Sequence, residues 1–239
     1  MNIKENVVTK WTIGNESSPT LEYQCNKQKN ELLQNNLYPI KAVNVLCTVT
    51  KDSYFSFDMP HISRCVNDVD KSHHNLIANH IAQSFRNRSR VKKNGFKRII
   101  ENCICNIRVN SLRGDLDIIC KDMFNKLNNL LNEVSDFYPA GYAHGDFGID
   151  NMLLDENSNI VMINFAYSHI YSPLIDAATL SFSLQSDHRN KELLFLDDLI
   201  DLEFSYYLKH IDIVKILKCI EWSSKSQNID EIMKLYDSI

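Results

Sequence analysis

The sequence predicts an α+β protein with a small, strand-containing N-terminal lobe, residues 1–60, and a mainly helical C-terminal lobe, residues 61–239. Two observations support this prediction. Segments rich in β-branched and aromatic residues are concentrated before Pro60, and amphipathic helical patterns dominate after it. The chain of 239 residues is long enough for a substantial core. Its composition, 44% hydrophobic and 23% charged, is typical of a globular protein.

The N-terminal lobe is expected to contain three strands and one helix. Residues 5–13 combine β-branched and aromatic side chains, which predicts a strand. A polar turn then precedes a helix over residues 21–34. Two further strands are expected on either side of a turn at Lys51-Asp52, within the stretch AVNVLCTVTKDSYFSFDMP.

The C-terminal lobe is expected to be mainly helical, with one short hairpin. Helices are predicted over residues 72–86 and 115–134, and the second has apolar side chains at helical spacing. The stretch NMLLDENSNIVMINF consists of an apolar run, a polar turn and a second apolar run, which predicts a short β-hairpin. From Asp176 onwards the sequence is a series of amphipathic helical patterns.

The composition argues against a secreted or membrane protein. The first ten residues lack the apolar segment of a secretory signal, and no run approaches the roughly 18 apolar residues of a membrane-spanning helix. The seven cysteines are odd in number and form no C-x-x-C pair, which favours reduced thiols over a disulfide framework or a zinc site. We therefore expect a cytoplasmic protein without a membrane partner.

The net charge of −4 conceals a basic segment. No acidic residue occurs between Lys71 and Ile100, and seven basic side chains lie between Arg86 and Arg98. This segment would suit an anionic ligand, but a solvated surface segment explains it equally well. Because no aromatic-interleaved RNA motif accompanies it, nucleic acid is the less favoured partner.

Three histidines, His73, His74 and His80, fall within the helix expected over residues 72–86. Such a group could hold a metal ion, but no carboxylate or cysteine lies nearby in the sequence. We therefore expect these histidines to lie on the surface.

The stretch YAHGDFGIDNMLL holds residue types that phosphoryl transfer requires. Transfer from a nucleotide to a hydroxyl needs a carboxylate to accept the hydroxyl proton and hard oxygen ligands for magnesium. Asp146 offers the carboxylate, and Asn151, five residues later, offers an amide oxygen at the start of a strand. A second metal ligand is expected on the far strand of the hairpin, where Asn164 stands.

With the residues that follow, this stretch resembles the core of the aminoglycoside phosphotransferase and choline kinase group, relatives of the protein kinases. The group's pattern is H-G-D-x-x-x-x-N, a hairpin carrying I-D-[FW], and a proline followed by D-L-A. This chain has HGDFGIDN, then MINF, then Pro173 followed by Asp-Ala-Ala, over about 35 residues. The resemblance implies a bilobal, protein-kinase-like fold that uses ATP and Mg²⁺. It also implies transfer of the γ-phosphoryl group to a hydroxyl of a small molecule such as a sugar, amino alcohol or aminoglycoside.

The resemblance further implies roles for individual residues. Asp146 would be the catalytic base, Asn151 a magnesium ligand, and Asn164 would occupy the position of the main magnesium ligand. His144 and Asp176 would support the loop. The triplet Asp-Phe-Gly at residues 146–148 spells the kinase metal loop, but the counterpart of that loop is MINF.

A nucleotide site in the N-terminal lobe is implied as well. Asp58 and Met59 lie in FDMP, where the hinge between the lobes would receive the adenine. Lys10 stands where a lysine would pair with the phosphates, and Glu22, or failing that Glu31, would be its partner.

The chain departs from the group's pattern in two places. Only nine residues precede Lys10, too few for two strands and a glycine-rich loop. Either Lys10 is misassigned, or another element covers the nucleotide, or the N-terminal lobe is reduced. Asn164 replaces the group's aspartate, and an amide lacks the negative charge that holds magnesium. Three explanations stay open: a catalytically impaired pseudokinase or binding module on the same scaffold, an enzyme that tolerates asparagine, or an introduced Asp-to-Asn change.

Overall fold

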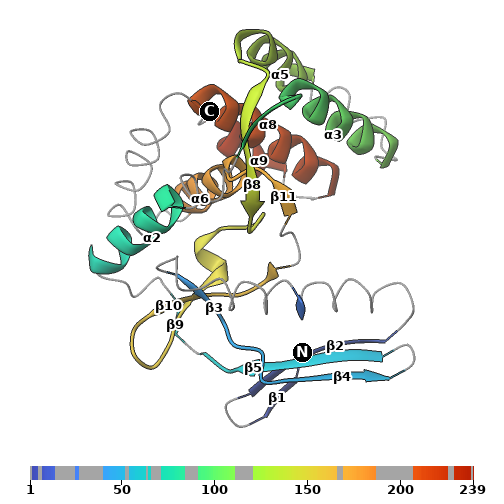
Figure 1. The fold of residues 1–239 in the computed structure, drawn as a ribbon. Coiled ribbons are helices and arrows are strands. Elements are labelled where there is room, and N and C mark those ends of the chain that lie inside the picture. Colours follow the sequence, from blue (N-terminus) through green and yellow to red (C-terminus); the bar gives the residue numbers. More distant parts are fainter. Residues whose placement is uncertain are drawn as a thin grey trace.

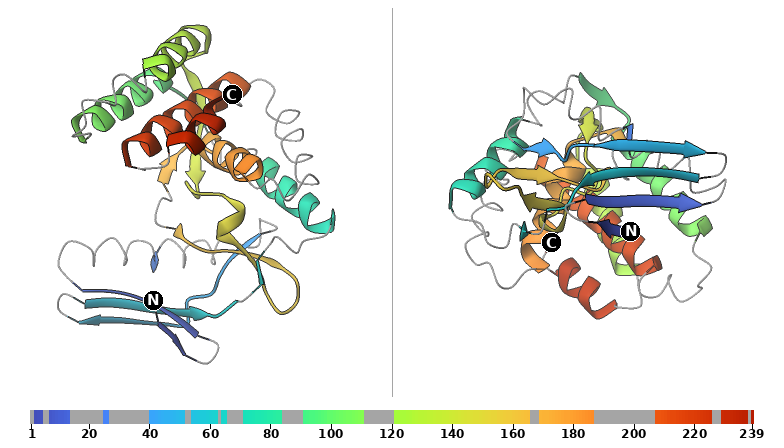
Figure 2. Two further views of the ribbon diagram at one scale, coloured as in Figure 1. Left: turned by 180° about the vertical axis from the view of Figure 1, so that it is seen from behind. Right: turned by 90° about the horizontal axis from the view of Figure 1, so that it is seen from below.

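The structure is a computed structural model that describes residues 2–4, 7–13, 25–26, 40–51, 54–62, 64–65, 71–83, 91–110, 121–165, 169–186, 207–225, 229–237 and 239. Figure 1 shows a small β-sheet at one end of the molecule and the helices α3, α5, α8 and α9 at the other. The helices α2 and α6 and the hairpin of β9 and β10 lie between these ends, and the view from behind in Figure 2 agrees.

The small N-terminal sheet is antiparallel throughout and has the strand order β1-β2-β5-β4. Its strands are β1 Asn2–Lys4, β2 Val7–Ile13, β5 Tyr54–Pro60 and β4 Cys47–Lys51. The two strands predicted around Lys51-Asp52 are therefore confirmed, and so is the strand predicted over residues 5–13 as far as its residues are described. Of the helix expected over residues 21–34, only residues 25–26 are described, and they are helical; the rest lies outside the described residues.

The inner face of this sheet is apolar because side chains alternate along each strand. Phe55, Phe57 and Met59 of β5 point to the same face and form a buried cluster with Val8 of β2. Val161 of the hairpin belongs to the same cluster. The core of the small sheet therefore continues into the hairpin that carries Val161.

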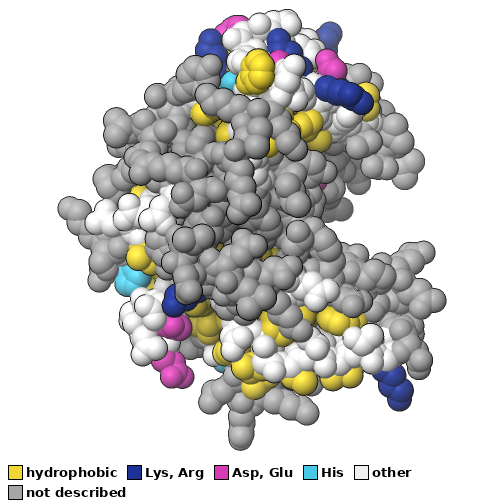
Figure 3. Space-filling view, in the orientation of Figure 1, with side chains coloured by type: hydrophobic (Ala, Val, Ile, Leu, Met, Phe, Trp, Pro, Cys, Tyr) yellow, Lys and Arg dark blue, Asp and Glu magenta, His cyan; other side chains and the backbone are white. Residues whose placement is uncertain are grey.

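The outer face of the sheet carries exposed apolar side chains, and Figure 3 shows hydrophobic side chains along this end of the molecule. Trp11 of β2 and Val49 of β4 lie on either side of Ser56 in one cross-strand row. Both are 48% exposed, whereas Ser56 between them is buried. The two larger side chains thus shield the serine of the central strand.

A second sheet joins distant parts of the chain in the order β3-β10-β9-β6. Its strands are β3 Lys41–Ala42, β10 Ile160–Met162, β9 Met152–Leu154 and β6 Arg64–Cys65. β9 and β10 form the antiparallel hairpin that the sequence predicts, and β3 pairs with β10 in parallel. A backbone hydrogen bond of 2.9 Å from Val43 N to Met162 O extends this pairing.

The third sheet leads into the loop that begins at His144 and carries Asp146. It has the antiparallel order β11-β8-β7, with β11 His169–Tyr171, β8 Phe137–Ala143 and β7 Val91–Asn94. β8 ends at Ala143, immediately before His144, and the short 3-10 helix η4 Ile149–Asn151 connects the loop to β9. The loop is therefore fixed between a strand of one sheet and a strand of another.

The helices supply most of the core. They are α2 Lys71–Gln83, α3 Phe96–Asn110, α5 Lys121–Glu133, α6 Leu174–Ser186, α8 Leu208–Lys225 and α9 Ile229–Asp237. α2 and α5 confirm the helices expected within residues 72–86 and 115–134 as far as those residues are described. In α8, Ile213, Ile216 and Ile220 are fully buried, at spacings of three and four residues that place them on one face.

Among the described residues, the structure contains no helix with the length and apolar character needed to cross a membrane. The division into lobes at residue 60 stays a prediction. It would place β3 in the first lobe and its parallel partner β10 in the second.

Candidate active site

The loop after β8 turns sharply at Gly145. This residue has φ of 84°, in the left-handed region that a glycine adopts without a steric penalty. The turn carries the chain from the end of β8 to Asp146, whose backbone oxygen then accepts a 2.9 Å hydrogen bond from Gly148 N. The loop is thus compact, with Asp146 at its apex.

Asp176 of α6 holds the start of this loop. Its carboxylate accepts hydrogen bonds from two successive backbone N–H groups, His144 N to Oδ2 at 2.8 Å and Gly145 N to Oδ1 at 2.7 Å. Asp176 is 1% exposed, so a buried charge is satisfied by two N–H donors. These two hydrogen bonds are consistent with the supporting role that the resemblance implies for Asp176.

Two further side chains of α6 continue the same row. Thr179 Oγ1 accepts a 3.1 Å hydrogen bond from Phe147 N, and Ser183 Oγ accepts one of 2.8 Å from Ile149 N. Positions 176, 179 and 183 are spaced by three and four residues and therefore share one face of the helix. The sequence did not reveal Thr179 and Ser183 as part of the site, although this spacing of polar residues in an apolar helix was a signal.

Gly148 faces the same row. A Cβ atom at this position would lie 3.3 Å from Ser183 Oγ, closer than an ordinary van der Waals contact. The close approach of the loop to α6 thus uses the absence of a side chain at Gly148.

Three of the predicted site residues meet at one oxygen. Asn151 Nδ2 donates hydrogen bonds to Asp146 Oδ2 at 2.9 Å and to Asp146 O at 2.8 Å. Asn164 Nδ2 lies 3.4 Å from Asp146 Oδ2, a long hydrogen bond. The structure therefore brings together the predicted base and both predicted metal positions, although they are spread over 19 positions from Asp146 to Asn164.

His144 braces the loop against the residues around Asn164. Its Nδ1 accepts a 3.3 Å hydrogen bond from Asp146 N, and its Nε2 lies 3.0 Å from Ile163 O. Because a carbonyl can only accept, these contacts correspond to a neutral imidazole with its proton on Nε2. The ring also makes an edge contact with Phe165, at 4.6 Å between centroids.

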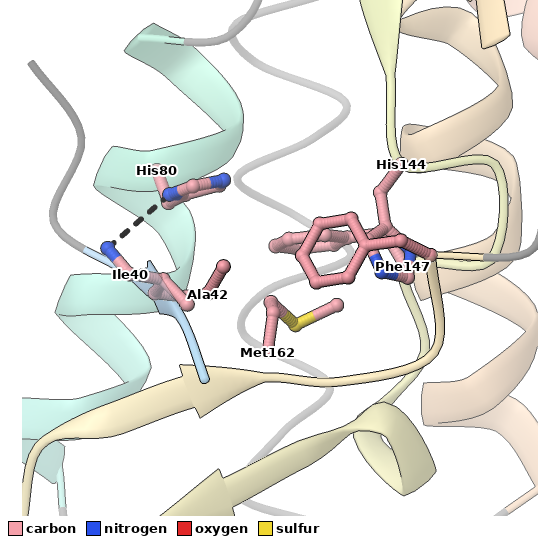
Figure 4. A pocket seen from close by; sticks show the side chains of 7 residues that line it. Ile40, Ala42, His80, His144, Phe147 and Met162 are labelled. Carbon is pink, nitrogen blue, oxygen red and sulfur yellow. Dashed lines mark hydrogen bonds between the residues drawn. The ribbon is translucent and has the colours of Figure 1, made fainter. Parts of the chain in front are cut away.

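His80 corrects one prediction. It is 4% exposed, not a surface histidine, because the face of α2 that carries it is turned towards Phe147 in the loop. Its ring stacks on Phe147, with centroids 5.1 Å apart and planes at 9°, and its Nδ1 accepts a 3.3 Å hydrogen bond from Ile40 N. Figure 4 shows His80 and Ile40 on one side of a small pocket and His144 and Phe147 on the other.

The other two predicted histidines differ from His80. A ring nitrogen of His73 donates a 2.8 Å hydrogen bond to Ser158 O in the hairpin turn, since the carbonyl can only accept. The side chain of His74 lies outside the described residues.

The predicted nucleotide residues lie in the small sheet. Lys10 pairs with Phe57 across β2 and β5 and therefore belongs to the apolar inner face, where burial lowers the pKa of its ammonium group. Met59 is buried on the same face. Glu22 and Glu31, the predicted partners of Lys10, lie outside the described residues.

Asp58 has a different environment from Met59. It lies within β5 on the outer face, where its Oδ1 accepts a 2.7 Å hydrogen bond from Thr9 Oγ1. Its backbone oxygen accepts a 2.8 Å bond from Leu46 N. Both contacts belong to the sheet itself, and the adenine-binding role of Asp58 stays a prediction.

The described part of the basic segment is divided between two elements. Lys92 and Lys93 are in β7, and Lys97 and Arg98 are in the first turn of α3. Residues 84–90 lie outside the described residues, so the anionic ligand expected there stays a prediction.

The donor atoms around Asp146 fit magnesium only in part. The described residues contain no cluster of three or more His, Cys, Asp or Glu side chains that could hold a metal ion. The amide oxygens of Asn151 and Asn164 are hard donors, as Mg²⁺ prefers, but they bring no negative charge. Asn151 uses Nδ2 for both of its hydrogen bonds to Asp146, so its Oδ1 takes no part in them. This donor set suits a cation held jointly with phosphate groups.

Of the comparisons with known proteins, the one with solved structures agrees with this architecture. No protein-family model matches the chain, and no curated protein matches its sequence. Among solved structures, a thermostable mutant of aminoglycoside phosphotransferase APH(4)-Ia in its apo form is similar, with a TM-score of 0.65. The identity to it is 10%, and the alignment covers 97% of this chain and 84% of that chain.

Two further phosphotransferases are similar in the same way. APH(3'')-Id from Streptomyces rimosus, solved in complex with ADP and streptomycin, has a TM-score of 0.59 at 11% identity, with 91% of this chain and 87% of that chain covered. An aminoglycoside phosphotransferase from Alicyclobacillus acidocaldarius has a TM-score of 0.55 at 12% identity, with coverages of 96% and 82%. At such identities the similarity establishes the fold. The α+β, protein-kinase-like architecture expected from the sequence is confirmed, and the chain has the fold of the aminoglycoside phosphotransferases.

Proposed function

We propose that this protein is an ATP-dependent phosphotransferase that transfers the γ-phosphoryl group to a hydroxyl of a small molecule. The observation that supports it most is the meeting of Asp146, Asn151 and Asn164 at one oxygen atom, on a loop whose backbone N–H groups donate buried hydrogen bonds to Asp176 of α6. Phosphoryl transfer depends mainly on positioning and electrostatics, so a rigid loop that presents one carboxylate meets its first requirement.

In this proposal Asp146 orients the acceptor hydroxyl and accepts its proton. Asn151 would contribute its amide oxygen to a magnesium ion shared with the nucleotide phosphates, and Asn164 would lie beside it. The bound ion would neutralise the charge of the phosphates during transfer. His144 and Asp176 keep the loop in place through their contacts with backbone groups.

The nucleotide would bind against the inner face of the small sheet. Lys10 lies on this face, and Met59 belongs to its apolar cluster. We propose Lys10 as the lysine that pairs with the phosphates, with Glu22 or Glu31 as its partner, and the segment of Asp58 and Met59 as the adenine side. ATP as the donor is supported by the complex of the similar protein APH(3'')-Id with ADP. A cytoplasmic location, as the cysteines indicate, would provide this nucleotide.

The test is substitution of the proposed base. D146N removes the carboxylate and keeps the shape of the side chain, and we expect ATP-dependent phosphorylation to fall by about 10²–10⁴-fold. A panel of sugars, amino alcohols and aminoglycosides with γ-labelled ATP would supply the acceptor. D150N, which neutralises an exposed carboxylate in the same loop, is the matched control. Undiminished turnover in D146N would exclude Asp146 as the base.

A non-catalytic binding module is the second candidate, and Asn164 is the observation that favours it. An amide in place of the main metal-binding carboxylate would reduce magnesium affinity and hence the transfer rate. Thermal unfolding with ATP, with and without MgCl₂, separates the candidates. If ATP raises the Tm in neither condition, the phosphotransferase proposal fails.

A further inference from the structure

The charge at the catalytic centre is unusually low for a magnesium site. Asp146, Asn151 and Asn164 meet within hydrogen-bond distance and carry one negative charge among them. Two amide N–H groups converge on the same carboxylate oxygen, Asp146 Oδ2, at 2.9 and 3.4 Å. The two amides thus satisfy this oxygen with hydrogen bonds and without a cation, while the single negative charge remains.

An aspartate at position 164 would reverse this balance. It would replace a hydrogen-bond donor by a second negatively charged oxygen at the same place, about 3.4 Å from Asp146 Oδ2. Two carboxylates at such a distance repel unless a cation lies between them. An aspartate at position 164 would therefore need a metal ion beside Asp146, whereas the asparagine does not.

The backbone accepts either residue. Asn164 has φ of 66°, in the left-handed region that asparagine and aspartate tolerate better than most residues. Exchange of the amide for a carboxylate therefore tests charge with little change in backbone strain.

We infer that the resting catalytic centre of this protein is complete without Mg²⁺, and that Asn164 makes it so by donating its amide hydrogen to Asp146. The cation then enters only together with the nucleotide phosphates, which supply the missing negative charge. This second step rests on the proposed function, whereas the first concerns the protein alone.

The experiment measures thermal unfolding without nucleotide, in EDTA and in MgCl₂ at matched ionic strength. We expect the unmodified protein to show the same Tm in both. N164D is expected to unfold about 2–4 °C lower in EDTA, or more, and to recover in MgCl₂ with saturation. N128D, which makes the same exchange on the exposed side of α5, should change neither value.

The double variant D146N/N164D restores one carboxylate and two amides to the cluster in exchanged positions. We expect it to regain the Tm of the unmodified protein in EDTA and to lose the response to MgCl₂, even if N164D alone is too unstable to purify. A double-variant Tm as low as that of N164D, or a fold that fails to return, would show that the coupling does not run through Asp146.

The inference is overturned if Mg²⁺ alone stabilises the unmodified protein as much as it stabilises N164D, or if N164D loses no stability in EDTA. Its outcome is separate from that of the proposed function. If ATP failed to raise the Tm of the unmodified protein with or without Mg²⁺, the phosphotransferase proposal would fall, and the magnesium-free results would still stand.

Discussion

The loop that carries Asp146, the proposed base, and the predicted nucleotide residues of the small sheet are held in place by different means. Four backbone N–H groups of the loop, from His144 to Ile149, donate to side chains of α6. In the small sheet, Lys10, Asp58 and Met59 are placed by the strand register, with one side-chain hydrogen bond from Thr9 to Asp58. The backbone of the loop is thus oriented by a few polar side chains that are distant in the sequence. The residues of the sheet are oriented by the many backbone hydrogen bonds between the strands.

The largest effect is expected for Asp176. D176N keeps the size of the side chain but replaces one of two carboxylate acceptors by an N–H donor beside a backbone N–H. Because the group is buried and each hydrogen bond to a charged partner contributes about 1.5–3 kcal/mol, the free energy of unfolding should fall by about 3 kcal/mol. Urea unfolding measures this loss, and E156Q in the exposed hairpin turn is the control. A loss no larger than that of E156Q would show that the loop is held in other ways.

An intermediate loss of stability is expected when a threonine is exchanged for valine in each of the two regions. T179V removes the acceptor of Phe147 N and should cost about 1–3 kcal/mol, since it leaves a buried N–H without its partner. T9V removes the donor to Asp58, which is only partly buried, and should cost about 1 kcal/mol or less. If the proposed function holds, T179V should also lower kcat more than it changes KM for ATP. Equal costs of the two exchanges in urea unfolding would contradict the difference between the regions.

A smaller effect is expected for acidification, which acts on the helical end and not on either of the two regions. His210 lies among Phe96 and Tyr207, and burial lowers the pKa of its imidazole, although hydrogen bonding to backbone carbonyls opposes this. Its folded pKa is below its unfolded value near 6.5, so the unfolded state binds the proton first as the pH falls. The stability contribution of neutral His210 is therefore complete above pH 6.5 and is lost as the pH falls from there towards the folded pKa.

H210Q tests this pH dependence. Its amide can still donate to Ser135 O, which His210 Nε2 contacts at 2.9 Å, but it does not titrate. We expect the fall in Tm between pH 7.5 and pH 5.5 to be shallower in H210Q than in the unmodified protein. Parallel curves would assign the acid sensitivity to other groups.

The sequence predicted those features that depend on local pattern. The strands β2, β4 and β5, the hairpin and the convergence expected of Asp146, Asn151 and Asn164 follow from patterns within short segments. The spacing of Thr179 and Ser183 from Asp176 indicated a shared polar face of the helix, but their hydrogen-bond partners could not be predicted, because these depend on the loop that packs against that face. The sequence did not predict the helix α3 or the strands β1, β3, β6, β7, β8 and β11. The shortest of these strands are defined by tertiary pairing and not by propensity.

The burial of His80 was also not predicted from the sequence. Leu76 and Ile77 precede it at spacings of four and three residues, so helical periodicity alone already placed it beside buried side chains. The surface prediction was wrong because the polarity of the residue outweighed its position. Stacking on Phe147 and a bond from Ile40 N satisfy the ring in the interior.

The parallel pairing of β3 with β10 has a consequence for synthesis of the chain. Ala42 and Val43 lie beside Met162, and Val161 completes the apolar cluster under the small sheet. A ribosome releases the first sixty residues long before the hairpin emerges, so Phe57 and Val43 lack part of their cover during most of translation. We therefore expect nascent chains that end before β10 to be the species most prone to aggregate and most dependent on chaperones.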